Sequence, residues 1–579
     1  MHSRSLSRSA AMLAAILFFC VAPIFAQAPL EPAQMPQQTL FYLLWRGAPP
    51  SSARAANSLL ALWDDPDFAP VRSGLVENLL SNSKKSQSTN PPLTGDEVTQ
   101  YSALLENAFV LGYLPQPHGS SAAPSDSTHK WNGFFFVYDR TGKEALLSKA
   151  VLQMRANEKE LPTISQTILG GIPVLKIEHK TGTTYWAEHD KYAIASSESA
   201  VFEQIVAALA GKTRGNSLAQ TIGYQEAQPA LKNGVLEFFL RLPRQAEIAS
   251  TLPATSKEKV PPILDAIHLD AVHCAYGQIL LEGSKTRMNG AILGDTTTGS
   301  LFDIFGDGQT TPVSLAFVSN DSISYQESQF SFLALYNLAK RAFLASQPPE
   351  QQNAAVFIEA MAQAKLGAPL SDVLGNFTGE FASIQSGPVT DVSKRTFFIG
   401  IRDKAATLKV IHTAMREQNI SENEKGNATF LDIPTGAKQA GAASAQTSFL
   451  HLAVLPDVVL ASTNTDTLQT EVARRATPPS SLPAAFQSVR AQYPEKVSGL
   501  GYYNFQQMDW DGLKKQMLES YSGPAAKSFA QKESTVQERT PPPAWLVRLD
   551  PKVFARHLHV STSASWKDAK GIHFDGWIE

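Results

Sequence analysis

The sequence predicts an α+β fold built from two tandem repeats of a split β-α-β-like antiparallel sheet, with helices on one face. Short runs of apolar and aromatic residues are typical of strands, and stretches with apolar residues at helical spacing follow them. Similar segments recur in the same order at separations of 264–286 residues. Because 579 residues exceed one compact core, we expect two halves, residues 37–308 and 309–579.

Residues 1–28 are typical of a secretory signal peptide. Arg4 and Arg8 precede an uncharged apolar run over residues 10–22, and the small residues at 26–28 suit a signal peptidase. The run is shorter than the roughly 20 residues that a membrane-spanning helix needs, and we expect no transmembrane segment in the mature chain. The sequence thus predicts an extracytoplasmic protein, periplasmic or secreted after signal-peptide cleavage.

Two strand–helix units provide the clearest recurrence. A strand over residues 134–139 matches one over 397–403, and each is followed by a helical pattern. A strand over 192–197 matches 458–463 at a separation of 266 residues, again with a helical pattern after it. Gly211 is a stop signal for the first of these helices.

Four further matches keep the same order along the chain. They pair residues 40–44 with 313–318, 235–240 with 499–504, 264–265 with 549–550, and the turn signal Asn289-Gly290 with Asp575-Gly576. All six pairs of segments occur in the same order, and the number of residues that separates the members of a pair changes only where loops intervene. We therefore interpret the chain as an internal duplication.

The central elements of the first half predict its topology. Strand-like runs at 174–179, 184–189 and 192–195 lie between two helical patterns. This is the order of the split β-α-β arrangement, in which an antiparallel sheet buries one face under two helices. The Gly-, Asp- and Thr-containing stretch 306–312 marks the expected boundary between the halves.

Some of these segments resemble a bacterial extracytoplasmic family that is known only as a domain of unknown function. The resemblance is carried by residues 374–380 followed by Phe381-Ala382-Ser383-Ile384, and by the strand at 192–197 with its helix. It implies an extracytoplasmic location and a repeated α+β architecture. It implies no catalytic residues.

The charge balance bears on the class of partner. Lys and Arg number 50 and Asp and Glu 53, a formal net charge of −3. Because a near-neutral surface exerts no overall attraction on a phosphate backbone, we expect no nucleic-acid partner.

Cys274 would be the only cysteine left after removal of the signal peptide. An intramolecular disulfide is then impossible, although an extracytoplasmic compartment would permit one. Its β-like surroundings at 271–276 predict a buried, unreactive thiol.

Two groups of residues are candidates for metal chemistry. His557 and His559 would lie on one face of a strand, and His573 on the following strand would complete a three-ligand zinc site. The alternative interpretation is a solvated face of the terminal hairpin. Residues 268–273 hold a similar group of two histidines and one aspartate.

The residues that carry chemistry form no coherent catalytic constellation, so the sequence favours a non-enzymatic binding or scaffold protein of the cell envelope. We expect its working surface on the sheets or in a groove between the halves, an unidentified envelope protein or small ligand as partner, and no cofactor. The alternative is a secreted hydrolase, which in its metal-dependent form would use His557, His559 and His573.

Overall fold

The computed structural model describes most of the chain. The described residues are 28–74, 102–115, 133–149, 163–179, 182–212, 216–244, 260–296, 299–306, 308, 312–348, 353–434, 449–476, 482–522 and 541–579. Residues 1–27 of the expected signal peptide and most of the expected boundary at 306–312 lie outside them. Helices and strands both contribute substantially, so the α+β class is confirmed.

Ten strands come from the N-terminal half of the chain. They are β1 (Phe41–Trp45), β2 (Phe109–Tyr113), β3 (Phe134–Asp139), β4 (Thr163–Leu169), β5 (Ile172–His179), β6 (Gly182–His189), β7 (Tyr192–Ser196), β8 (Leu236–Arg241), β9 (Val272–Glu282) and β10 (Lys285–Gly294). β5, β6 and β7 are the three strands expected from the apolar runs at 174–195.

Ten more strands come from the C-terminal half. They are β11 (Ser322–Gln329), β12 (Phe377–Ser386), β13 (Arg395–Ile401), β14 (Ser421–Lys425), β15 (Ala428–Pro434), β16 (Phe449–Val454), β17 (Val458–Ser462), β18 (Gly499–Asn504), β19 (Val560–Asp568) and β20 (Gly571–Ile578).

All twenty strands belong to one antiparallel sheet. From edge to edge the strands are paired in the order β4-β5-β6-β7-β3-β2-β1-β8-β9-β10-β20-β19-β18-β11-β12-β13-β17-β16-β15-β14. The two sets of ten therefore meet at β10 and β20, and one continuous sheet crosses the expected boundary between the halves.

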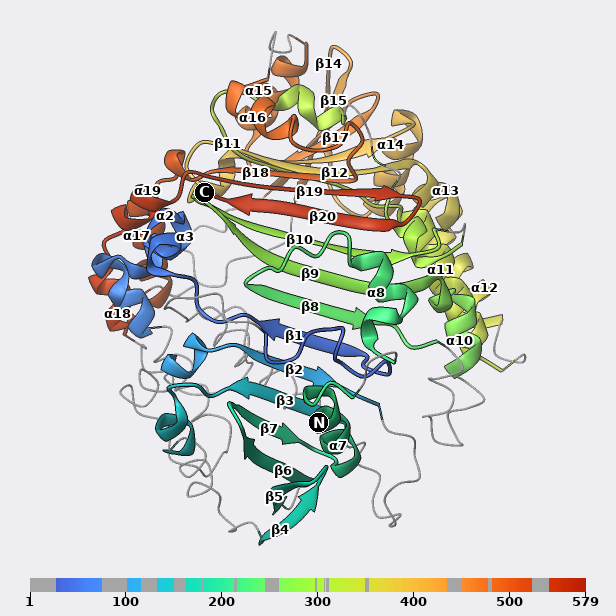
Figure 1. Ribbon diagram of the computed structural model, residues 1–579. Helices are drawn as coiled ribbons and strands as arrows, with labels where there is room; N and C mark the ends of the chain where they lie inside the picture. The colour runs from blue at the N-terminus through green and yellow to red at the C-terminus, as the bar shows by residue number, and fades with distance from the viewer. Residues whose placement is uncertain are drawn as a thin grey trace, which may run out of the picture.

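Four helices cover one side of this sheet (Figure 1). They are α7 (Ser199–Leu209) and α8 (Ile222–Ala227) on the N-terminal strands, and α15 (Thr465–Ala476) and α16 (Ala484–Arg490) on the C-terminal strands. Each pair buries a hydrophobic core against the sheet: Phe202 and Ile205 of α7 lie in the first, Leu468 and Phe486 in the second. The glycine expected to end α7 follows it, with a φ of +72° at Gly211.

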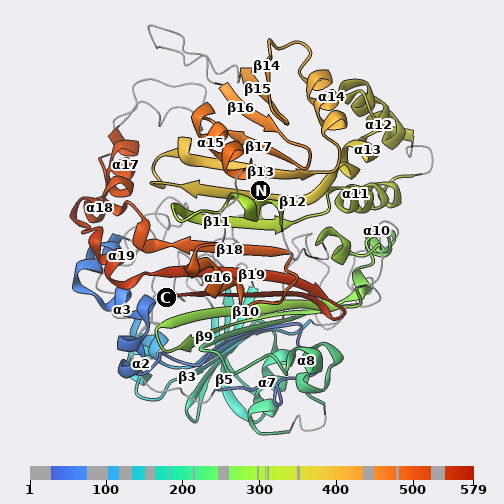
Figure 2. The ribbon, with the colours of Figure 1, turned by 90° about the horizontal axis from the view of Figure 1, so that it is seen from above.

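The sheet is bent along its central strands. β1 to β3 and β8 are seen broadside in Figure 1, whereas β11 to β13 are seen broadside from above in Figure 2. α7 and α8 lie in front of the sheet in Figure 1, and α15 and α16 lie in front of it in Figure 2. The four helices are therefore on the outer side of the bend, and the opposite face of the sheet is on its inner side.

Further helices gather at the two ends of the strands (Figure 1). One end carries α2 (Ser51–Ala56), α3 (Ser58–Asp64), α17 (Trp510–Ser522), α18 (Ala544–Arg548) and α19 (Lys552–His557), and the other carries α10 (Val260–Ala266), α11 (Phe332–Ser346), α12 (Asn353–Leu366) and α13 (Leu370–Gly375). α3 packs on α19 and α10 packs on α11. Each end thus joins the N-terminal half of the chain to the C-terminal half.

The central strand pair carries two polar links between the halves. Arg287 of β10 donates from Nε and Nη2 to the two carboxylate oxygens of Asp575 in β20, at 2.7 and 2.9 Å. The Lys285 ammonium lies 3.8 Å from the centroid of the Trp577 ring. A two-pronged Arg–carboxylate contact fixes orientation as well as charge, so it supports the register of the central pair.

The expected opening strand at 313–318 is wrong. Residues Val313–Phe317 form a 3-10 helix, and the strand of this half begins later, as β11. The Glu380 carboxylate accepts hydrogen bonds from the backbone N–H groups of Val313 and Ser314 at 2.9 and 2.8 Å. A buried carboxylate that captures the first amides of a helical turn competes with strand pairing.

The expected turn at Asn289-Gly290 is also wrong. Both residues lie inside β10, as Asp575-Gly576 lie inside β20, and the hairpins turn instead at residues 283–284 and 569–570. A Cβ on Gly290 would lie 2.4 Å from the carbonyl oxygen of Tyr276. The glycine therefore permits a close approach of two strands rather than a turn.

The expectation that helices cover one face holds for α7, α8, α15 and α16 but is too narrow. α14 (Lys404–Ala414) packs from the other side of the sheet, where Leu408 and Ile411 contact the cluster of Leu431, Val454 and Val459. The sheet around this cluster, in β13, β15, β16 and β17, is thus buried on both sides, whereas β14 is exposed.

Candidate functional site

The inner side of the bend presents exposed apolar side chains at its centre. Side chains alternate along a strand, so Phe239 of β8 is fully buried beneath α8 while its neighbours point to the opposite side. We define the inner face by six large apolar side chains of the central strands that are 36–47% exposed: Phe238 and Leu240 of β8, Met288 of β10, Phe574 of β20, Phe381 of β12 and Phe397 of β13.

Three of these phenylalanines lie on one row across the sheet. In register order the row runs through Phe238, Gly277, Gly290, Phe574, Ser565, Gly499, Ser328 and Phe381. Since adjacent strands lie about 4.8 Å apart, Phe574 is about 14 Å from Phe238 and about 19 Å from Phe381. Phe381 in turn contacts Phe397, with ring centroids 6.3 Å apart.

The residues between the rings are small and uncharged. A Cβ on Gly277 would lie 2.4 Å from the ring of Phe238, so that ring lies over the glycine. A Cβ on Gly499 would lie 2.6 Å from the hydroxyl oxygen of Ser565. The floor between the rings therefore consists of backbone and serine hydroxyls, which suits an extended apolar molecule with few polar groups.

Toward both edges of the sheet, the strands that flank the inner face are buried on this same side. Toward β3, Trp45, Phe109 and Tyr138 pack in a cluster with Leu147. Toward β14, α14 covers the cluster that contains Val459. The inner face thus lies between two covered regions of the sheet.

Buried carboxylates lie on the helix-covered side instead. Glu237 of β8 accepts a hydrogen bond from the Tyr42 hydroxyl and lies 3.8 Å from Nη2 of Arg46. Burial raises the pKa of Glu327 to about 7, although its Oε1 accepts a hydrogen bond from Nε2 of Gln329 at 2.8 Å. Each of these carboxylates packs within a core, away from the inner face.

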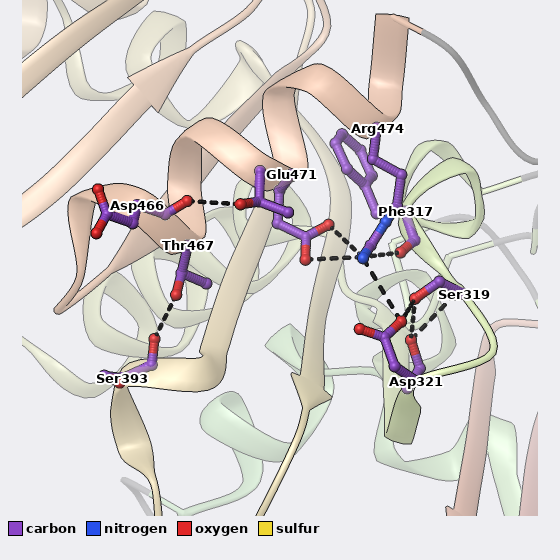
Figure 3. Close-up of polar contacts among 10 residues, drawn as sticks. Phe317, Ser319, Asp321, Ser393, Asp466, Thr467, Glu471 and Arg474 are labelled. Carbon is purple, nitrogen blue, oxygen red and sulfur yellow. Dashed lines mark hydrogen bonds and ion pairs between the residues drawn. The ribbon is translucent and has the colours of Figure 1, made fainter.

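Glu471 of α15 is a third buried carboxylate, shown in Figure 3. Nη1 of Arg474 donates to both of its oxygens at 2.9 Å and to the carbonyl oxygen of Phe317 at 3.2 Å. Burial raises the pKa of Glu471 to about 7, and the charge of Arg474 opposes this shift. Because Nη2 of Arg474 also lies 3.5 Å from Asp321, the group ties α15 to the segment before β11 and is a structural connection.

A pocket of about 360 Å³ lies at one end of β8 and β9, and its lining includes Asp270 and His273. His268 does not line it and instead faces a neighbouring hollow together with Asp270. Nδ1 of His273 is 2.9 Å from Glu226 and Nε2 is 3.6 Å from Asp295. Both ring nitrogens thus already face carboxylates, and the residues predicted at 268–273 do not form one site.

The predicted zinc ligands take separate partners. His557 ends α19, so the expected strand at 557–559 is wrong there, and its Nε2 lies 2.8 Å from Asp65. His559 precedes β19, and His573 in β20 places Nε2 3.1 Å from Asp568. In the part of the chain that the structure describes, no three His, Cys, Asp or Glu side chains are grouped so that they could hold a metal ion.

Cys274 is a buried thiol, as its β-like sequence predicts. Its Sγ donates to the carbonyl oxygen of Gly223 at 3.1 Å, and burial raises the thiol pKa to about 12. Because the thiolate is the reactive form, Cys274 is a packing residue rather than a nucleophile.

The sequence predicts a working surface on the sheets or in a groove between the halves, but it does not single out the six residues of the inner face. A signal for this face is present in β8, where the consecutive residues Phe238, Phe239 and Leu240 place apolar side chains on both faces of the strand. A strand with one solvated face alternates polar and apolar residues, so such runs indicate two apolar faces. The helices cover only one of them.

No protein-family model and no curated protein matches the sequence significantly. Among solved structures, one described as crystal form I of TP0453 aligns with 45% of this chain and 75% of its own, at 9% sequence identity and a TM-score of 0.21. That similarity is too distant to bear on function. Among the helices of the described residues, none has the length and apolar character needed to cross a membrane.

Proposed function

We propose that this protein is a non-enzymatic binding protein of the cell envelope that holds an extended apolar ligand, of the acyl-chain type, on its inner face. The observation that carries the proposal is the row of exposed rings of Phe238, Phe574 and Phe381. An antiparallel sheet with a solvated face normally presents polar side chains there. A row of exposed apolar rings on one face of a sheet instead marks that face as a candidate binding surface.

The chemistry of the surrounding rows supports an apolar ligand. The neighbouring row runs through Leu236, Ile279, Met288, Gly576, Ser563, Gly501, Gln326, Ser383 and Phe397. Neither this row nor the row of three phenylalanines contains a charged residue. An acyl chain lying across the strands can therefore contact successive rings without desolvating a charge, which would be costly.

Titration with a dansyl-labelled fatty acid tests this function. Each ring of Phe238 and Phe574 offers part of its surface, and covering it contributes about 1 kcal/mol. The double variant Phe238→Ser/Phe574→Ser should therefore bind the probe roughly 30-fold more weakly than the wild type.

The matched control for this titration is Val392→Ser/Val547→Ser, which removes two exposed apolar side chains of the 3-10 helix Val392–Lys394 and of α18. It should bind the probe like the wild type. Equal binding by all three proteins, or no binding by the wild type, would contradict the proposed function.

We also propose that the two sets of ten strands are copies of one unit, with the halves at 37–308 and 309–579. Outward from the centre the first set runs β10-β9-β8-β1-β2-β3-β7-β6-β5-β4, and the second runs β20-β19-β18-β11-β12-β13-β17-β16-β15-β14. At each position of the two series, the strand of the second set carries the number of its counterpart in the first set plus ten, so β10 corresponds to β20 and β1 to β11.

The cores beneath the helices support the same proposal. In the first half Phe239 contacts Tyr42 and Tyr224, with ring centroids 5.8 and 5.3 Å apart. The corresponding trio of the second half is Tyr502, Tyr325 and Phe486, where Phe486 contacts both tyrosines at 5.6 and 5.4 Å. An experimental structure tests the duplication: superposing β7 on β17 should bring Tyr42 onto Tyr325, and failure of the two trios to coincide would refute it.

The signal-peptide pattern supports a location outside the cytoplasm. Export would leave a mature chain that begins near residue 27 or 29. N-terminal sequencing of the protein purified from its native cells tests this, and retention of Met1 would contradict it. The residues that the structure describes offer no specific observation in favour of the hydrolase alternative.

A further inference from the structure

Helix α12 carries a group of strongly exposed apolar side chains. Val356, Phe357, Ile358 and Met361 are 56–66% exposed. Successive residues of an α-helix are turned by about 100°, so Val356 to Ile358 span roughly 200° of the helix circumference. Because all three of these side chains are exposed, more than half of the helix circumference is open to solvent, and α12 projects from the fold.

The surroundings of α12 agree with this. It contacts α11, α13 and α14, and both ribbon views place it at the outer edge of the molecule, beyond α11 and α13 (Figures 1 and 2). Phe357 and Met361 are four residues apart and Ile358 and Met361 three apart, so these side chains adjoin one another on one side of the helix.

The charges on α12 are compatible with a lipid headgroup layer. Its acidic residue, Glu359, is paired with Lys340 of α11 at 2.6 Å and accepts a hydrogen bond from Tyr336. Lys365 adds a positive charge in the last turn. The helix therefore presents apolar side chains and a cation, with its negative charge already compensated.

The size and shape of this apolar group favour a membrane over a second copy of the chain. The four side chains together expose roughly 500 Å², whereas a stable dimer buries about 800 Å² on each partner. A projecting helix also meets its own copy along a narrow line, while a bilayer interface takes up the apolar face of such a helix to a depth of about 5–10 Å.

We propose that α12 is a membrane-contacting helix, which inserts Phe357, Ile358 and Met361 into the interfacial region of a lipid bilayer. The contact goes beyond ligand binding on the inner face and does not depend on it. Because the attraction is mainly apolar and the whole protein is slightly acidic, binding to vesicles should change little with salt concentration.

Flotation with vesicles of phosphatidylcholine and phosphatidylglycerol (3:1) tests the proposal. The mature wild type should float with the vesicles, and Phe357→Ser/Ile358→Ser should lower its partition at least tenfold. The control Val392→Ser/Val547→Ser should float like the wild type. Equal flotation of all three proteins, or no flotation of the wild type, would overturn the proposal.

A second measurement places the helix directly. In a Phe357→Trp variant the added emission should shift to shorter wavelength with vesicles and be quenched by brominated lipid, and an unchanged emission would overturn the proposal. A wild type that is dimeric by light scattering, and becomes monomeric in Phe357→Ser/Ile358→Ser, would also overturn it. Binding of the dansyl fatty acid should be unaffected by these substitutions, which separates failure of this contact from failure of the proposed function.

Discussion

Replacing Glu327 with Gln should stabilise the protein in a pH-dependent way. Burial in the core beneath α16 raises the pKa of Glu327 from 4.5 to about 7. Well below pH 4.5 the carboxyl group is neutral in both folded and unfolded chains, so it carries no ionisation penalty there. As the pH rises from 4.5 to 7 the unfolded chain ionises first, and the native protein loses up to about 3 kcal/mol of stability relative to it.

The assay is urea unfolding, followed by far-UV circular dichroism, of the wild type and Glu327→Gln at pH 4.5, 6 and 8. The variant keeps an oxygen to accept the hydrogen bond from Gln329 but cannot ionise. Its unfolding free energy relative to the wild type should grow by about 3 kcal/mol between pH 4.5 and 8. Asn423→Gln, at an exposed position of β14 without a titratable group, is the control and should show a constant difference. A pH-independent difference for Glu327→Gln would refute the reasoning.

Two further predictions concern the cores. Phe486→Ala should lower the unfolding free energy by about 3–5 kcal/mol, because its fully buried ring contacts both Tyr325 and Tyr502; a loss below about 1 kcal/mol in urea unfolding would contradict the described packing. Cys274 of the native mature protein should react with a thiol reagent at pH 8 far more slowly than in urea, because burial raises its pKa to about 12; rapid stoichiometric labelling of the native protein would show that the thiol is accessible.

The fold class and several elements could be predicted from the sequence because their signals are local. The strand at 192–196, the helix after it and its end at Gly211 depend on apolar spacing and on one glycine with positive φ. The matched segments 192–197 and 458–463 do form strands, β7 and β17, which pair with β3 and β13.

The errors arose where distant residues decide the local structure. Residues 313–317 leave the strand conformation because Glu380, far along the chain, binds their amides. His557 lies in a helix because Val553 and Leu558 pack against Leu62 and Phe68 of the other half. A local sequence pattern does not reveal which distant residues will pack against a segment, and this tertiary packing can override the local preference.

The residues of the inner face could not be predicted from the sequence for a related reason. Phe238 and Phe574 are 336 positions apart, and only the pairing of β10 with β20 brings them onto one row. Apolar runs such as β8 indicate two apolar faces, but which face the helices cover depends on the whole sheet.

The most direct test of the central claim is to place a tryptophan on the inner face. In a Phe574→Trp variant, a fatty acid brominated along its chain should quench the emission of the added tryptophan with the same midpoint as binding of the dansyl fatty acid. A Val547→Trp variant, on the surface of α18, should show no such quenching of its added emission. Binding of the fatty acid without quenching at position 574 would place the ligand elsewhere and contradict the account.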